Sequence, residues 1–356
     1  MSKDFALLTT TRFLAVALTA ICIAGCTLTP QQQFAERMTT HGFDKREVEA
    51  SLRQAEKRDD IIALMSKPAE AVKPWKDYAP LFLTDARRKN GLAFWHEHAE
   101  TLAKVEQQYG VPAEFMVAII GVETNYGRNM GKHRVLDALN TLAFHYPPRS
   151  PYFTAELEQF FLLAREQNWL LTTPMGSYAG AMGLGQFMPT SYRKWAIDAN
   201  GDGQINLFLN PVDAIGSVGN YFQLHGWQPG GALMLPVSLP AAPAPELLYP
   251  KRDMNPVADL LAAGLVAPVM LQPEWQGVLL AFDEPDGRHH YLGFNNFRVI
   301  TRYNKSPLYA RAVLEFAAQL KAAYAPFETL PTPAAPVATA AAPEVNATAN
   351  NRAGNQ

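Results

Sequence analysis

Gly121-Val122-Glu123-Thr124-Asn125-Tyr126-Gly127 closes an apolar segment that starts near Pro112. The pattern predicts a helix over residues 112–126, because Pro112 suits a first helical turn and Gly127 can end the helix. Glu123 lies on an apolar stripe of this helix, since the residues three, four, seven and eight positions before it are Ile120, Ile119, Met116 and Phe115. We therefore expect the Glu123 side chain to face the protein interior.

Two features of the helix act on the Glu123 carboxyl group. A negative charge in the last turn opposes the helix dipole, and apolar surroundings raise a carboxyl pKa by desolvation. Both favour a carboxylic acid that is still protonated near neutral pH, as a general acid that breaks an acetal bond must be. Alternatively, Glu123 reaches solvent at the helix end or pairs with Arg128. Glu114, about 180° away around the helix, is expected to face solvent.

Composition places the chain among globular proteins. It has 356 residues, of which 48% are hydrophobic and 18% charged, enough for one large or two modest domains. The net charge of −2 offers no footprint for nucleic acid, so no nucleic-acid partner is expected. Its six Trp, 13 Tyr and 19 Phe fit binding of an uncharged polymer such as a carbohydrate, although most aromatic residues pack in cores.

Residues 1–25 have the pattern of an export signal. Lys3 and Arg12 flank its first part, and the apolar run 13–23 is too short for an ordinary membrane span. The run ends in Ile23-Ala24-Gly25-Cys26, which resembles the bacterial lipobox, where the protein is cut before the cysteine and lipid is attached to it. This resemblance implies that Cys26 anchors the mature chain to the membrane through lipid. The alternative is an ordinary secreted protein with an incidental cysteine.

The lipobox resemblance has two further implications. Thr27, in place of Asp, directs the protein to the periplasmic face of the outer membrane, with residues 26–33 as a linker. Cys22 leaves with the signal and Cys26 is modified, so the mature chain has no disulfide to stabilise it.

The remaining pattern predicts a mainly α (α+β) protein. Residues 34–100 form an amphipathic helical flank, 101–235 a helical core and 236–302 a small β subdomain, in which hairpin strands 277–282 and 289–294 precede a third strand, 297–303. Segment 303–328 adds a closing helix, and 329–356 is an Ala/Pro-rich tail expected to be disordered. The adjacent pair His289-His290 is expected on the surface, since neighbouring strand residues point to opposite faces.

Two loops offer binding groups. The glycine-rich stretch 176–189 permits close backbone approach to a ligand, with Ser177 and Gln186 as hydrogen-bonding groups; the alternative is a helix kinked by small residues for tight packing. Arg149 lies on the loop before the helix predicted over 151–167, where function is more common than in a helix core.

A third loop reads as the first nine positions of a calcium-binding EF-hand. Oxygen side chains stand at its first, third and fifth positions, a glycine at the sixth and a backbone carbonyl at the seventh. The twelfth position is Leu209, so the last ligand would come from further along the chain. We expect Ca²⁺ to be bound by Asp198, Asn200, Asp202, the Gln204 carbonyl and Asp213. A turn without metal, in which Asp213 belongs to the start of a helix capped by Asn210, is the alternative.

Taken together, residues 121–127, 180–189, the Asp198 loop and Tyr303-Asn304 resemble the bacterial lytic murein transglycosylases. The resemblance covers about 34–324 and keeps the order and spacing of the motifs. It implies a lysozyme-like helical catalytic core with a helical flanking domain and a small β subdomain. It also implies cleavage of the β-1,4 bond between N-acetylmuramic acid and N-acetylglucosamine in peptidoglycan without water, which leaves a 1,6-anhydromuramyl end.

The resemblance also implies roles for single residues. Glu123 acts first as acid and then as base, and the substrate's 2-acetamido group replaces the second carboxylate of ordinary glycosidases, although Asp137 or Glu158 could still fold close. Ser177 and Gln186 contact the sugar or its acetamido arm. Arg149 matches the second of two arginines that meet the peptide stem, while Pro148 replaces the first, which puts the peptide contact in doubt. Further groove-lining positions are Tyr78, Phe187, Tyr221, Tyr303, Asn304 and Tyr309.

Two other functions remain open at this stage. A hydrolytic, lysozyme-like muramidase would use the same groove and acid, and a non-catalytic scaffold that binds peptidoglycan would keep the groove but not the acid.

Overall fold

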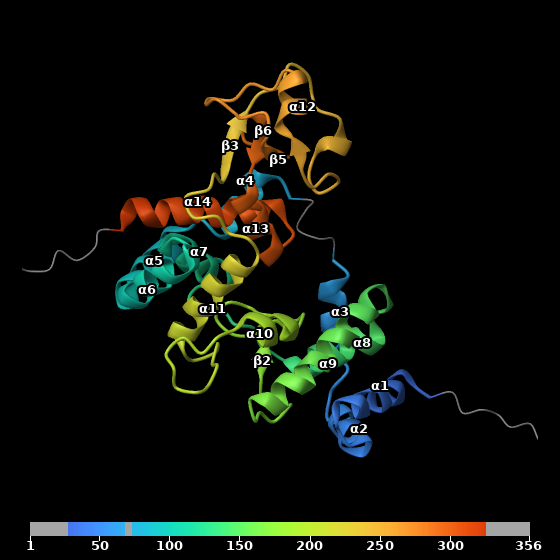
Figure 1. Cartoon of the computed structure of the whole chain (residues 1–356). Coiled ribbons are helices and arrows are strands. Elements are labelled where there is room, and N and C mark those ends of the chain that lie inside the picture. Colours follow the sequence, from blue (N-terminus) through green and yellow to red (C-terminus); the bar gives the residue numbers. More distant parts are fainter. Residues whose placement is uncertain (1–27, 68–72, 325–356) are drawn as a thin grey trace, which may run out of the picture.

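The computed structural model describes residues 28–67 and 73–324 (Figure 1). The expected export signal 1–25, the expected lipid site Cys26 and the expected tail 329–356 lie outside the described residues. Within the described chain, most residues are helical and the strands are short, which confirms a mainly α (α+β) fold.

The N-terminal flank is a series of short helices. Helix α1 starts at Pro30, inside the 26–33 segment expected to be a linker, because Thr29 caps it and proline suits its first position. The helices of this part are α1 (Pro30–Met38), α2 (Lys45–Arg53), α3 (Asp59–Met65), α4 (Trp75–Tyr78), α5 (Asp85–Glu97) and α6 (Ala99–Tyr109). Two of these helices, α5 and α6, meet at His98.

Helix α7 (Ala113–Thr124) is the centre of the molecule. Every residue from Ala113 to Val122 is buried, because α5, α6, α11 (Pro211–Leu224) and α14 (Pro307–Ala323) pack around it. Such a helix has no solvent face, so the expectation that Glu114 faces solvent is wrong. Glu114 is 8% exposed, and Lys321 Nζ on α14 lies 2.7 Å from its Oε1.

The end of α7 differs from the expected glycine stop. Asn125 and Tyr126 have φ angles of 49° and 59°, so Asn125 ends the helix in the left-handed conformation. The Tyr126 ring then lies against α7 and α5 where side chains are missing, since a Cβ added at Gly121 or Gly91 would collide with its hydroxyl. These two glycines let the chain turn back tightly after Glu123.

The helical pair α8 (Val135–His145) and α9 (Ser150–Glu166) forms a second helical region, on which α1 to α3 pack (Figure 1). The glycine-rich stretch follows α9 as a series of turns. It is linked to the start of α8 by a two-stranded ladder of β1 (His133–Arg134) and β2 (Met175–Gly176). Helix α10 (Pro189–Trp195) leads from this stretch to the Asp198 loop.

The small β subdomain is an antiparallel sheet with the order β3-β6-β5-β4 (Figure 1). Strand β5 alternates between two cores: Val278, Leu280 and Phe282 join the main core, whereas Leu279 joins a smaller core with Val257 and Leu292. The predicted hairpin is confirmed. The elements are β3 (Met234–Val237), β4 (Asn255–Pro256), α12 (Val257–Ala262), β5 (Gln276–Glu284) and β6 (Gly287–Gly293).

The strand predicted over 297–303 is wrong, because these residues belong to helix α13 (Asn295–Tyr303). Its buried residues Asn296, Phe297, Ile300 and Thr301 follow a helical spacing. A short run of β-branched and aromatic residues fits a strand and a buried helix equally well, and here the tertiary contacts decide.

Candidate active site

A groove of about 1860 Å³ runs between the α8–α9 region and the β subdomain. Its walls come from α9, α10 and α11 on one side and from β5, α13 and the turn before α14 on the other. The predicted site residues that line it are Arg149, Gln186, Phe187, Tyr221, Tyr303 and Asn304.

Glu123 lies at the last turn of α7, and its charge acts on Tyr303, which lines the groove. Its Oε1 accepts a 2.6 Å hydrogen bond from the Tyr309 hydroxyl on α14. Burial, reinforced by the negative charge of Glu123, raises the pKa of Tyr309 well above its usual value. The same two causes, in the same order, raise the pKa of Tyr303, which lines the groove. Tyr309 therefore remains a neutral hydroxyl donor to Glu123 at any physiological pH.

Three aromatic rings form the groove wall near Glu123. The ring centroids of Tyr221 and Tyr303 are 4.8 Å apart, and Phe187 lies 5.9 Å and 5.8 Å from them. Each tyrosine hydroxyl donates to a backbone carbonyl: Tyr303 to Gly185 at 2.6 Å and Tyr221 to Arg302 at 2.7 Å. These bonds fix the rings, so the wall is rigid before a ligand arrives.

The glycine-rich stretch holds its two polar residues by local hydrogen bonds. Ser177 Oγ accepts from the N–H groups of Ala179 and Ala181. Gln186 has a φ of 51°, and its Nε2 donates to the carbonyls of Met130 and Gly183. The Gln186 amide is thereby oriented at the groove, whereas Ser177 stabilises the turn beside it.

Arg149 lies at the far wall, at the N-cap position of α9. Its guanidinium carbon is 4.8 Å from the Tyr152 ring centroid and 4.9 Å from that of Phe153. Glu156 lines the same wall and was not singled out in the sequence; burial raises the pKa of its carboxyl. Its spacing from Arg149 and Tyr152 follows one helix face, which is the signal that could have found it.

One predicted groove residue is placed differently, and another lies at the groove rim. Tyr78 is fully buried and packs against Trp75 and Phe82, so that Trp75 and not Tyr78 lines the groove. Asn304 is exposed at the rim, and its Oδ1 accepts from the Ser306 N–H in the turn before α14.

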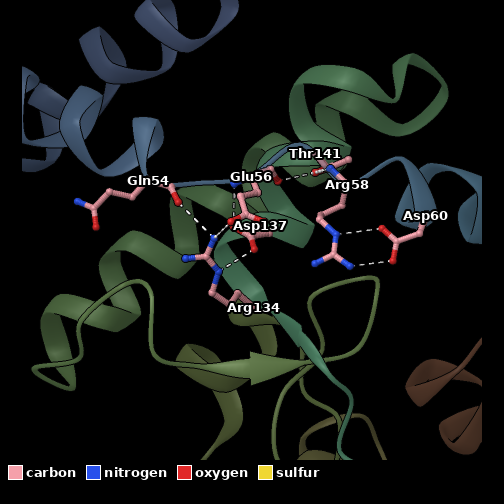
Figure 2. Close-up of polar contacts among 7 residues, drawn as sticks. All are labelled: Gln54, Glu56, Arg58, Asp60, Arg134, Asp137 and Thr141. Atoms are coloured by element: carbon pink, nitrogen blue, oxygen red, sulfur yellow. Dashed lines mark hydrogen bonds and ion pairs between the residues drawn. The ribbon is translucent and has the colours of Figure 1, made fainter.

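Asp137 and Glu158, which the sequence leaves open as second acids, are held by ion pairs elsewhere. Asp137 is 1% exposed and accepts from Arg134 Nε at 2.7 Å and from the Glu56 N–H at 2.9 Å, as Figure 2 shows. Glu158 pairs with Arg37 at 2.9 Å. Both carboxylates fasten the N-terminal flank to the α8–α9 region.

The Asp198 loop has the oxygen donors that Ca²⁺ prefers. Asp213 is fully buried, and burial, together with the charge of Asp198, raises its pKa. A cation would relieve this repulsion, so the donor set fits Ca²⁺. The further predicted ligands Asn200, Asp202 and Gln204 lie in the same loop.

The loop carboxylates at present accept N–H groups of the loop itself. Asp198 accepts from Gly201 at 2.7 Å and Asp213 from Asn206 at 2.8 Å. Within the described chain, carboxylate or imidazole atoms of three residues lie within 4.8 Å of one another only at Glu284, Asp286 and His289. The carboxylates of the Asp198 loop are further apart. Binding of Ca²⁺ therefore requires these carboxylates to turn from N–H groups to the metal.

Arg311 on α14 is a second residue that the sequence did not reveal. It is 5% exposed, pairs with Glu284 at 2.9 Å, and its guanidinium carbon lies 4.3 Å from the Trp75 ring and 4.7 Å from that of Phe282. It joins α14 to α4 and β5 only two residues after Tyr309. Sequence offers no signal for it, because the partners come from three distant segments.

Comparisons with known proteins agree with this geometry. A family model described as the transglycosylase SLT domain matches residues 29–318. The chain is 44% identical over 292 residues to the membrane-bound lytic murein transglycosylase B of Escherichia coli (strain K12), covering 79% of this chain and 80% of that protein.

Solved structures are also similar. The soluble lytic transglycosylase SltB1 from Pseudomonas aeruginosa matches with a TM-score of 0.76 and 44% identity, over 82% of this chain and 98% of that one. The Escherichia coli lytic transglycosylase Slt35, described as in complex with calcium, matches with a TM-score of 0.75 and 42% identity, over 83% of this chain and 93% of that one.

Proposed function

The chain belongs to the transglycosylase SLT family, and we propose that Glu123 is the single catalytic carboxyl group with which it performs the chemistry of that family. It is a lytic transglycosylase that cleaves peptidoglycan without hydrolysis. The bond is the β-1,4 bond between N-acetylmuramic acid and N-acetylglucosamine, and the product carries a 1,6-anhydromuramyl end. The observation that carries the role of Glu123 is the 2.6 Å hydrogen bond that it accepts from the neutral Tyr309, which follows the groove residue Leu308.

Glu123 acts as an acid in the first step. Its carboxyl proton moves to the glycosidic oxygen, the bond from C1 of muramic acid to that oxygen breaks, and the N-acetylglucosamine side leaves with a free 4-hydroxyl. The carbonyl oxygen of the substrate's own 2-acetamido group then stabilises the electron-poor C1. Tyr309 stabilises the negative charge that Glu123 acquires, because it donates a hydrogen bond to the carboxylate.

Glu123 acts as a base in the second step. Its carboxylate takes the proton of the C6 hydroxyl, O6 bonds to C1, and the acetamido oxygen withdraws from C1. Glu123 ends protonated, as it began, and no water is consumed. One residue suffices because both proton transfers take place on the same side of the groove. The ion pairs of Asp137 and Glu158 elsewhere in the protein support the use of a single carboxyl group.

The groove residues orient the glycan for these steps. The rings of Phe187, Tyr221 and Tyr303 present apolar faces to sugar rings, and Gln186 directs a polar group to the acetamido arm. Ser177, Asn304, Tyr78 and Tyr309 support this part of the groove. Arg149, held by Tyr152 and Phe153, meets a carboxylate of the peptide stem.

Digestion of purified sacculi, followed by mass spectrometry of the products, tests the reaction. The wild-type protein should release muropeptides with 1,6-anhydro ends, and Glu123→Gln should release almost none. Glu114→Gln, on the same helix, is the matched control and should cleave normally. Reducing muramic ends would instead identify a hydrolytic muramidase, and wild-type protein that binds sacculi without cleaving them would identify a scaffold.

We also propose that the Asp198 loop binds a structural Ca²⁺ through Asp198, Asn200, Asp202, the Gln204 carbonyl and Asp213. The buried Asp213 and the related structure described with calcium support this assignment. Ca²⁺ at ten times its Kd should add about 1.4 kcal/mol to the free energy of unfolding. Calorimetry with Ca²⁺ and with EGTA measures the effect, Asp202→Asn should weaken it, and an unchanged melting temperature at millimolar Ca²⁺ would refute the site.

The proposed location is the periplasmic face of the outer membrane, with lipid on Cys26. Within residues 28–67 and 73–324, no helix is long and apolar enough to cross a bilayer. The lipobox residues 23–26 support the lipid anchor, and the Escherichia coli relative is named membrane-bound. Membrane fractionation of the wild type and of Cys26→Ala tests it: only the wild type should sediment with outer membranes.

A further inference from the structure

The described part of the chain starts at Leu28, two residues after the proposed lipid anchor Cys26. Thr29 and Gln32 close the first turn of α1 reciprocally, with N–H···O distances of 3.2 Å to Thr29 Oγ1 and 2.9 Å to Gln32 Oε1. Gln33 Nε2 also donates to the Leu28 carbonyl at 2.9 Å. Cys26 is two residues before Leu28, and two residues span at most about 7 Å. The covalent connection between lipid and folded protein therefore has almost no slack.

Helix α1 is fixed to the α8–α9 region. The ring centroids of Phe34 and Phe161 are 5.6 Å apart, and Arg37 pairs with Glu158 on α9 at 2.9 Å. Arg165, further along α9, donates to the His41 carbonyl at 2.8 Å. Apolar packing and two polar contacts thus hold the first helix to its neighbour, so any constraint on Leu28 is passed to α9.

Helix α9 also forms a wall of the groove. Glu156 lines the groove, whereas Glu158 contacts α1, and residues two apart in a helix point about 200° apart. A single helix, about 10 Å wide, therefore separates α1 from the groove. Helix α1 has nine residues and is about 14 Å long, and this helix and the width of α9 lie between Leu28 and the groove.

The surface at the start of α1 suits a lipid headgroup layer. Residues 28–35 contain no acidic or basic residue, and Leu28 is 42% exposed. Removing a charged group from water would be costly, and residues 28–35 can enter the headgroup layer without that cost. The family match, too, begins at residue 29, three residues after the cysteine.

We propose that the N-terminal end of α1 rests in the headgroup layer of the membrane that holds the Cys26 lipid. The catalytic groove is then held close to that surface, with α1 and the width of α9 between them. This inference rests on the lipid anchor proposed above. As a consequence, the size of the folded protein limits the distance from the bilayer at which the enzyme can cleave. Only glycan strands within that distance are substrates, because no flexible linker extends it.

Fluorescence quenching in vesicles tests the proposal. The mature chain has no free thiol once Cys26 carries lipid, so Leu28→Cys and Met270→Cys each give a single labelling site. Met270 is 85% exposed in the segment between α12 and β5, and these two elements lie at the end of the molecule opposite α1 (Figure 1). In phosphatidylethanolamine/phosphatidylglycerol vesicles with a headgroup-nitroxide lipid, an environment-sensitive dye at residue 28 should be quenched several-fold more strongly than at residue 270.

An insertion provides the matched control. About 20 Gly/Ser residues placed between Thr27 and Leu28 span roughly 25 Å on average and should lower quenching at residue 28 to the level of residue 270. Equal quenching at the two sites, or no effect of the insertion, would overturn the inference. Mass spectrometry of the N-terminal peptide checks the lipid separately: its absence removes both the anchor and this inference, whereas its presence with equal quenching removes the inference alone.

Discussion

Glu123 and Asp137 are two carboxylates in two regions, and a different donor lies beside each: a tyrosine hydroxyl at Glu123 and a guanidinium at Asp137. Asp137, where α8 meets the 54–58 segment, is 1% exposed and lies 2.7 Å from the Arg134 guanidinium (Figure 2). Glu123, between α7 and α14, is half-buried and accepts from the neutral Tyr309 hydroxyl at 2.6 Å.

This difference separates a structural carboxylate from the one that we propose to be catalytic. A guanidinium beside a buried carboxylate favours the charged form. A hydroxyl donor stabilises the charge less and also tolerates the neutral acid, so the group can give up a proton and take it back. Acid-then-base catalysis requires the second environment.

The largest expected effect comes from removing the proton of Glu123. Glu123→Gln keeps the volume and can still accept from Tyr309, but it can neither donate nor take the proton in either step. We expect kcat on sacculi to fall by about 10³-fold or more, with little change in the free energy of unfolding. Rates of anhydromuropeptide release and urea unfolding curves measure the two quantities. Activity within tenfold of wild type would remove Glu123 from the mechanism.

Asp137→Ala should have the opposite signature. The substitution removes the buried acceptor of the Arg134 guanidinium and of the Glu56 N–H group, and it loosens the contact of segment 54–58 with α8. We therefore expect a loss of about 3 kcal/mol in the free energy of unfolding. The kcat of the protein that remains folded should not change. Asp137→Asn, which still accepts from the Glu56 N–H, should lose less. A specific loss of kcat at full stability would contradict the structural assignment.

The comparison also indicates what the sequence could predict. The apolar run before Glu123 sufficed to predict α7 and the position of its acid, because a long periodic segment determines a helix locally. It could not predict that Glu114 is buried, since the helix that covers it, α14, comes about two hundred residues later. The same distance hides Arg311 and the contact between Tyr309 and Glu123. Tyr309 entered the predicted site only through family resemblance, and as a groove residue.

Short segments failed for a different reason. The run 297–303 has strand-like composition, and only the packing of Phe297 and Ile300 against the core selects a helix. Tyr78 was expected in the groove, but Trp75, three residues earlier, takes that place. A motif predicts the region of the fold in which a residue lies. Which side chain of that region lines the groove depends on the helices and strands that pack around it.

Tyr309→Phe sharpens the comparison because it removes the neutral donor alone. The carboxylate form of Glu123 loses a hydrogen bond to a charged group, so kcat should fall about ten- to hundredfold. The alkaline limb of the pH–rate profile should move to higher pH, since the Glu123 acid that the first step requires ionises less readily without this donor. Tyr249→Phe, which removes a tyrosine hydroxyl bonded to the Lys305 carbonyl at the groove rim, is the control for general loosening. A rate loss without a shift in the pH profile would argue that Tyr309 only packs.

Glu156 offers the smallest effect, and it tests a third kind of carboxylate. Glu156 is 5% exposed and accepts from the Thr190 N–H at 2.9 Å, and burial raises its pKa above the ordinary 4.5. The folded state therefore holds this proton more tightly than the unfolded state. As pH rises from about 4.5 through the raised pKa, the group's contribution to stability falls, and above that window it is constant.

Glu156→Gln cannot titrate, yet it keeps an acceptor for Thr190. The stability of the wild type relative to this variant should therefore decline as pH rises through that window, by less than the Asp137→Ala effect. Urea unfolding of both proteins from pH 4.5 to 7.5 measures the difference. Parallel curves would mean that solvent in the groove ionises Glu156 in the folded protein as easily as in the unfolded chain. Burial would then not distinguish Glu156 from the carboxylates at the surface.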